Sequence, residues 1–307
     1  MSPKFIILAS LFLSAAANAT PNETPTGPAT VYVVEVVDGA PHLATGGSVP
    51  SHAAVVPNED RDVWTGRAAT TEVNGVRVGD AFVVVGTEGA VVSCKVTGID
   101  VLVRGANMEG FDLQAEGPSC GVPEPWARLD CGEGITNGLA VRVGVPVPLP
   151  YRPQPQVSDV AADNATQAVL GSKAWQGLLR EAQERSGGLA VSDDLDLRSF
   201  TGPSGTFTAV EAVVYSGEGF AICGGADFLS RVIGVVDESG RVVVPFFRMD
   251  AVVGVEAATI ETLIDADRDG IPEVWTHQFS FDGHQALLDQ SGQERVVVDH
   301  PWCGCPC

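Results

Sequence analysis

The sequence has no apolar run long enough to cross a bilayer as a helix. A span takes about 20 consecutive apolar residues, and the best candidate, residues 5–17, is shorter and lies at the N-terminus. Lys4 precedes this run, and a small-x-small pattern at 17–19 closes it. A positive start, an apolar run and a small-residue end are typical of a cleavable secretory signal. We therefore expect removal of residues 1–19, a secreted or periplasmic location and no membrane insertion after cleavage.

Basic residues are scarce. The whole chain has 18 lysines and arginines against 39 acids, and without Lys4 of the signal the formal net charge becomes −22. Such a surface repels phosphate backbones and anionic lipids, so nucleic acids and membrane surfaces are not expected partners. It attracts cations, although a strong negative charge also serves solubility alone.

Several catalytic and nucleotide-binding motifs are missing as well. The chain has no H-E-x-x-H zinc site, no G-x-S-x-G elbow, no P-loop and no G-x-G-x-x-G after a strand. Two acids can still meet in space, as they do in glycosidases. A secreted hydrolase therefore stays open as the alternative to a protein without catalytic function.

Cysteine, in contrast, is plentiful, with seven residues in the chain. In an oxidising compartment cysteines form disulfides, and an odd number leaves at least one thiol free or bonded elsewhere. We expect Cys120 to pair with Cys94 or with Cys131, which would staple the first half of the chain. We expect Cys223 to pair with one cysteine of the C-terminal group, which consists of Cys303, Cys305 and Cys307.

Short runs of β-branched residues with Gly-containing turns between them dominate the first half. The runs that read as strands include residues 31–37, 81–85, 90–96, 99–103, 126–129 and 139–143. Asp38-Gly39 and Asn74-Gly75 are strong hairpin signals. Many short strands indicate an antiparallel sandwich or barrel-like domain, which we place at residues 30–144 after a flexible lead-in at 20–29.

Five prolines mark the segment 145–157, VPVPLPYRPQPQV. Because prolines favour an extended conformation, we interpret this segment as a linker between two domains. The alternative is a proline-rich edge of one continuous domain.

The remaining residues, 158–307, combine one helix with strands. Trp175, Leu178, Leu179 and Ala182 recur at the spacing of one helical face. Strand-like runs return from Leu195 onward. We therefore predict a second, mainly β domain, an antiparallel sheet with one packed helix.

Residues 265–273, DADRDGIPE, carry the sharpest chemical signal. Three carboxylates alternate along the loop and can converge on one point, and a glycine in sixth place allows a tight turn. Ca²⁺ takes six to eight hard oxygen ligands. The predicted ligands are the side chains of Asp265, Asp267, Asp269 and Glu273 and the main-chain carbonyl of Ile271.

The loop differs from an EF-hand, which carries an acid in twelfth place where this chain has Thr276. Residues 259–277 instead resemble the calcium loops of FG-GAP and VCBS-type repeats, in which an acid in ninth place closes a strand-loop-strand unit. The resemblance implies a structural calcium ion, and the alternative is a solvated acidic turn. The chain has neither the FG-GAP signature nor a second D-x-D-x-D-G, so a β-propeller is not expected.

These observations lead us to expect an exported, acidic, calcium-binding β-rich protein. We expect it to act as a binding or surface-interaction module with an extracellular protein or glycan as partner. The alternatives are a secreted hydrolase with structural calcium and an exported protein in which calcium only stabilises the fold.

The signal pattern makes a testable prediction about processing. Cleavage after the Ala-Asn-Ala pattern should give a mature N-terminus at Thr20. N-terminal sequencing or intact-mass measurement of exported material checks this. Exported protein that retains residues 1–19 would contradict the prediction.

Overall fold

The structure is a computed structural model that describes nine segments of the chain. The predicted signal peptide and lead-in lie outside them, as do five of the seven cysteines, Cys120, Cys223, Cys303, Cys305 and Cys307. The described ranges are 31–46, 56–57, 63–104, 124–132, 134–185, 191–216, 228–250, 259–278 and 282–301.

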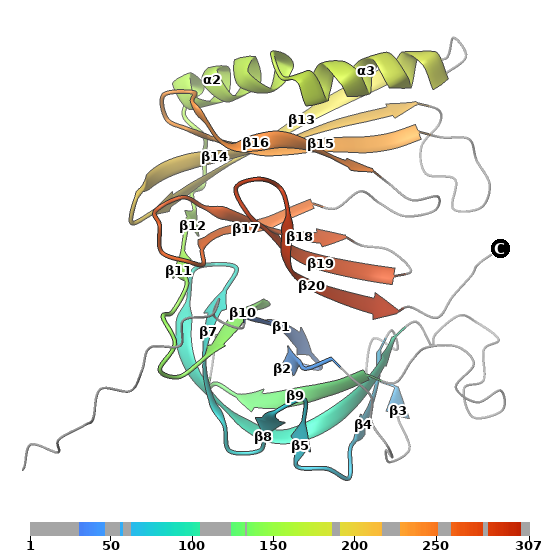
Figure 1. The fold of residues 1–307 in the computed structure, drawn as a ribbon, viewed down its shortest axis with the longest axis vertical. Helices are drawn as coiled ribbons and strands as arrows, with labels where there is room; N and C mark the ends of the chain where they lie inside the picture. The colour runs from blue at the N-terminus through green and yellow to red at the C-terminus, as the bar shows by residue number, and fades with distance from the viewer. Residues whose placement is uncertain are drawn as a thin grey trace, which may run out of the picture.

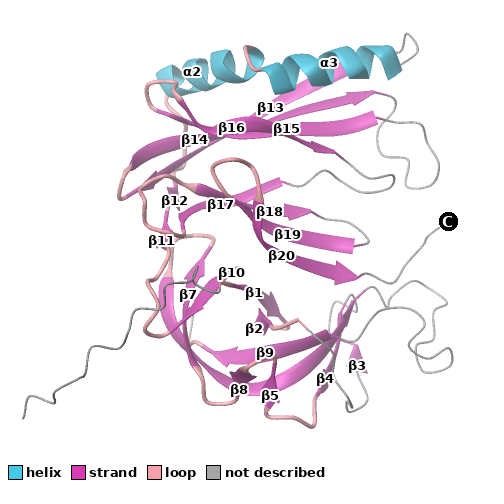
Figure 2. Ribbon diagram, viewed as in Figure 1, coloured by secondary structure: helices cyan, strands magenta, loops and turns pink. Residues whose placement is uncertain are grey.

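Three antiparallel sheets and a helical layer lie one above the other (Figure 1). Strands dominate the chain, and the helices cover one outer face of the stack (Figure 2). The predicted fold class, mainly β with antiparallel sheets and a packed helical region, is confirmed. We call the three sheets the barrel sheet, the middle sheet and the outer sheet.

The barrel sheet holds the N-terminal strands in the order β3-β4-β8-β7-β10-β1-β2-β9, and an additional β8–β9 pairing closes a ring. Beside it lies the short hairpin of β5 and β6. The strands are β1 (Tyr32–Val37), β2 (Ala40–Ala44), β3 (Val56–Pro57), β4 (Val63–Arg67), β5 (Glu72–Val73), β6 (Val76–Arg77), β7 (Ala81–Gly86), β8 (Val91–Arg104), β9 (Glu124–Asp130) and β10 (Gly138–Arg142).

Two predictions about turns in this sheet had different outcomes. Asp38 and Gly39 have φ angles of 51° and 71°, the left-handed values of a tight hairpin turn, and they join β1 to β2 as predicted. The separation of runs 90–96 and 99–103 is wrong, because both belong to β8. The register shifts between Val96 and Gly98, so Gly98 marks a bulge within one long strand rather than a turn.

Each of the other two sheets is a four-stranded meander with a short fifth strand at its edge. The outer sheet contains β12 (Arg152–Pro153), β13 (Val191–Gly202), β14 (Gly205–Ser216), β15 (Phe228–Asp237) and β16 (Val242–Asp250). The middle sheet contains β11 (Leu149–Pro150), β17 (Thr259–Asp265), β18 (Glu273–Gln278), β19 (Asp282–Leu288) and β20 (Glu294–Pro301). The proline-rich segment thus supplies one edge strand to each sheet, and the domain boundary placed there stays a prediction.

Two helices, not one, form the helical layer: α2 (Asp159–Leu170) and α3 (Lys173–Arg185). The face predicted from Trp175 belongs to α3 and lies against the outer sheet. Helix α2 was not predicted because its buried positions are only Ala165 and Val169, which give a weak apolar pattern. Within the described parts of the chain, neither helix has the length and apolar character needed to cross a membrane.

Alternation of side chains along the strands explains how the layers hold together. On β14, Val210 and Ala212 join the cluster under the helices, whereas Ala209 joins the cluster between the outer and middle sheets. The middle sheet is apolar on both faces. Leu263, Val274 and Leu288 face the outer sheet, and Ile264, Trp275 and Leu287 lie against residues of the barrel sheet.

A charged group is buried between the outer and middle sheets. Glu211 is 3% exposed, and it accepts a hydrogen bond from the Ile260 amide at 3.0 Å. Arg198 donates to the Ile260 carbonyl and to Glu211. In the described residues β11 pairs with only the last two residues of β17. The side chains of Glu211 and Arg198 therefore provide the hydrogen bonds to the Ile260 amide and carbonyl that a neighbouring strand would otherwise make.

The described disulfide joins Cys94 to Cys131. The expectation that Cys120 pairs with one of them is therefore wrong, since each is the other's partner. Lys95 lies opposite Asp130 in the β8–β9 pairing, and this register places the two cysteines across from each other. The pairing of these strands depends on the closure of the barrel, which no local sequence signal reports.

Removal of this disulfide should destabilise the protein. The sequence separation is 37 residues, and closing a loop of that size contributes about 2–4 kcal/mol to the free energy of unfolding. The double variant Cys94→Ala, Cys131→Ala should lose about that amount in urea unfolding. Peptide mapping without reductant provides the check on connectivity, and a Cys94–Cys120 peptide would contradict the structure.

Candidate metal centre

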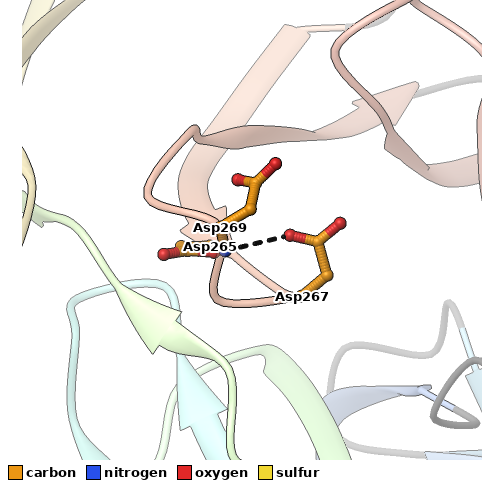
Figure 3. Close-up of side chains that lie close together, drawn as sticks. All are labelled: Asp265, Asp267 and Asp269. Atoms are coloured by element: carbon orange, nitrogen blue, oxygen red, sulfur yellow. Dashed lines mark hydrogen bonds between the residues drawn. The ribbon is translucent and has the colours of Figure 1, made fainter.

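The loop between β17 and β18 gathers three carboxylates at one end of the middle sheet (Figure 3). Asp265, Asp267 and Asp269 each offer an oxygen, and these oxygens all lie within 4.8 Å of one another. Asp265 is buried at the end of β17, whereas the other two are exposed. The predicted convergence of these three side chains is confirmed.

The loop folds around its own carboxylates. Asp267 Oδ1 accepts a hydrogen bond from the Asp269 amide at 3.3 Å, and Asp269 Oδ1 accepts one from the Ile271 amide at 2.8 Å. Asp265 Oδ2 accepts one from the Gly270 amide at 3.1 Å. Gly270 has a φ angle of 87°, which glycine adopts at no steric cost. The alternating aspartates and the glycine therefore specify the turn locally.

One buried carboxylate oxygen of this loop accepts no hydrogen bond from the residues that the structure describes. Asp265 is 2% exposed, and among the described residues its Oδ1 is buried without a hydrogen bond. Burying a charged oxygen without compensation is costly, so such groups are normally paired or bound to a metal ion. A cation at the aspartate cluster would satisfy this oxygen.

Glu273, at the start of β18, adds a fourth acid beside the cluster and is 0% exposed. Its Oε2 accepts a hydrogen bond from the Ala266 amide at 2.7 Å. Burial raises the pKa of Glu273 to about 7, and the charges of Asp267 and Asp265 also favour the protonated form. Burial likewise raises the pKa of Asp265, with repulsion from Asp269 and Asp267 in the same direction. The loop holds more negative charge than its surroundings neutralise.

Two side chains from the β19–β20 hairpin reach this loop. Arg295 Nη1 lies 3.0 Å from Asp267 Oδ2 and 3.2 Å from Glu273 Oε1. Gln290 Nε2 donates to Asp269 Oδ2 at 2.6 Å. Sequence reasoning missed both residues, because they follow the loop by about twenty residues and no spacing rule links them to it.

The loop is also fastened to neighbouring segments. The Tyr151 hydroxyl lies 2.5 Å from Ser204 Oγ and 3.5 Å from the Gly270 carbonyl oxygen. Arg268 Nε donates to the Val147 carbonyl at 2.9 Å. The Tyr151 ring needs the glycine at 202, where an added Cβ would lie 2.2 Å from the ring. The loop thereby links the middle sheet to the outer sheet and to the proline-rich segment.

The donor set fits a hard cation. Carboxylate oxygens suit Ca²⁺, Mg²⁺ or Mn²⁺ rather than the soft metals that thiolates bind. Of the five predicted ligands, the structure brings together the three aspartates. Glu273 lies next to them, with its oxygens bound to Ala266 and Arg295. Glu273 and the Ile271 carbonyl stay predicted ligands.

No protein-family model matches this chain, and no curated protein and no solved structure shows significant similarity to it. The resemblance to FG-GAP and VCBS-type loops therefore rests on the loop alone. Fold and site define a mainly β protein with a carboxylate cluster that could hold a metal ion.

The Tyr151 hydroxyl generates a prediction about the loop. Tyr151→Phe removes the link to Ser204 and to the Gly270 carbonyl, and should lower the free energy of unfolding by about 1 kcal/mol. Hydrogen exchange of the loop amides at 266–271 should become faster. Ser204→Ala removes only the hydroxyl pair and serves as the control, with little effect on the loop. Unchanged exchange in Tyr151→Phe would show that the hydroxyl does not restrain the loop.

Proposed function

We propose that this protein is exported and binds one calcium ion in the loop 265–273, where the ion has a structural role. The observation that carries the proposal is that Asp265 Oδ1, in a cluster of three carboxylates, is buried and has no hydrogen-bond partner in the described part of the chain. A solvated acidic turn would not need an aspartate that is 2% exposed. The signal pattern at residues 1–19 supports the extracytoplasmic location.

Calcium is the ion that this arrangement favours. The three aspartates each offer one oxygen to the cluster, and two of them are exposed, so water molecules can complete the shell of an ion that takes more than three ligands. Ca²⁺ tolerates irregular geometry with six to eight oxygens, whereas Mg²⁺ demands a near-ideal octahedron and loses water reluctantly. Extracellular calcium sites commonly bind at about 10⁻⁴ to 10⁻³ M, which suits an exported protein.

The ion would act on stability because of where the loop is attached. Its neighbours Tyr151 and Val147 belong to the proline-rich segment, and Ser204 belongs to the turn between β13 and β14 of the outer sheet. Fixing the loop backbone would fix these contacts as well. We therefore assign the protein a role as a binding or surface-interaction module with an extracellular protein or glycan partner, in which calcium stabilises the fold. The signal pattern at residues 1–19 supports an extracytoplasmic role of this kind.

Asp265→Asn gives a sharp test of calcium binding. In chelator the variant should be at least as stable as the wild type, because the buried charge is gone. Calcium at ten times its Kd should stabilise the wild type by about 1.4 kcal/mol, a rise of a few degrees in melting temperature. The variant should lose this rise, and Mg²⁺ should substitute poorly in the wild type. The measurement is thermal unfolding with calcium, with magnesium or with chelator.

Asp193→Asn is the matched control, since it makes the same chemical change at an exposed aspartate on β13. It should keep the full calcium response. A wild-type melting curve that is identical in calcium and in chelator would favour the solvated turn. A calcium response that survives in Asp265→Asn would place the ion elsewhere.

A further inference from the structure

Arg295 brings a positive charge onto the predicted ligand oxygens. Its Nη1 lies 3.0 Å from Asp267 Oδ2 and 3.2 Å from Glu273 Oε1. Its Nε lies 3.6 Å from Asp289 Oδ2 in the adjacent turn. One guanidinium therefore contacts two acids of the loop 265–273 and one acid outside it.

We propose that Arg295 competes with the metal ion for the carboxylates of the loop 265–273. In the absence of calcium the guanidinium pairs with these carboxylates, and this competition sets the calcium affinity. This inference rests on the proposed function. A divalent ion bound to the Asp267 carboxylate would lie close to the Arg295 guanidinium, which contacts the same carboxylate. Binding must therefore push Arg295 away or proceed against its charge. In either case the arginine weakens binding and stabilises the ion-free loop.

The surroundings of Arg295 suit such an exchange. Glu273 is 0% exposed, so without a metal ion it depends on Arg295 and one backbone amide for compensation. The Arg295 side chain is 41% exposed, so it can move toward water. Asp289 offers a place to move to, because its Oδ1 is held by the Ser291 amide at 2.8 Å and stays in the turn.

The turn that begins at Asp237 in the outer sheet resembles the turn that begins at Asp289. Its arginine, however, does not contact the loop 265–273 in the described part of the chain. The outer sheet has Asp237-Glu-Ser-Gly-Arg241 where the middle sheet has Asp289-Gln-Ser-Gly-Gln293. In both turns the aspartate Oδ1 accepts hydrogen bonds from the amides two and four residues later. Arg241 pairs with Asp237 of its own turn, whereas Arg295 reaches the metal loop. Arg241→Gln is therefore a matched control for Arg295→Gln.

The experiment is calorimetric titration of CaCl₂ into the chelator-treated mature chain, together with melting curves in chelator. Arg295→Gln should bind calcium about tenfold more tightly, as expected when one positive charge beside a divalent ion is removed from a well-solvated site. Its melting temperature in chelator should fall, because Glu273 loses its partner. The variant should thus gain calcium affinity while it loses stability in chelator. A purely structural role of Arg295 would not produce this combination.

Two further variants keep the test decisive. Arg295→Lys retains the positive charge and should stay within about threefold of the wild-type Kd. Arg241→Gln changes the net charge equally and should leave the Kd unchanged. If Arg295→Gln does not fold in chelator, Arg295→Met, which keeps an aliphatic side chain, takes its place.

The outcomes separate this inference from the proposed function. If the wild type binds calcium, and if among the variants only Arg295→Gln binds it more tightly, the result supports both the calcium site and the competitor role of Arg295. Wild-type binding that the variant leaves unchanged or weakens overturns the role of Arg295 and leaves the calcium site standing. Binding by the variant but not by the wild type supports the competitor and overturns calcium binding by the natural protein. Absence of binding in both proteins overturns both.

Discussion

The middle sheet is the constraint on which the rest of this structure depends. Its strands carry apolar residues on both faces, so each face must be covered by another layer. Val274 and Trp275 are neighbours in sequence, and they join clusters on opposite sides of the sheet. The outer sheet covers one face, and the barrel sheet covers the other (Figure 1). The stack of layers follows from this requirement.

The loop 265–273 contacts the outer sheet through Tyr151 and Ser204, and the proline-rich segment through Val147. Burial at the end of β17 and the start of β18 takes Asp265 and Glu273 out of water, and their charges then need partners. Arg295 and backbone amides supply part of that compensation, and Asp265 Oδ1 has none among the described residues. The carboxylate cluster that could hold a metal ion depends on packing as much as on loop sequence, because packing creates the uncompensated charge.

Much of the local structure could be predicted from the sequence, because local chemistry decides it. Hairpin signals such as Asp38-Gly39, the apolar spacing around Trp175 and the alternating aspartates each act within a few residues. Prediction was wrong where the deciding contact was distant. Gly98 reads as a turn but forms a bulge in β8, and Cys94 bonds to Cys131 because the barrel closes.

By itself the sequence determined the mainly β character of the chain and the D-x-D-x-D-G turn. Backbone preferences and hydrogen bonds between near neighbours are enough for both. Only the tertiary structure decided which carboxylates are buried and which residues face them. Arg295 follows Asp267 by 28 residues, and no spacing rule brings them together. Their meeting depends on the order and register of the strands of the middle sheet, which the packing of all layers selects.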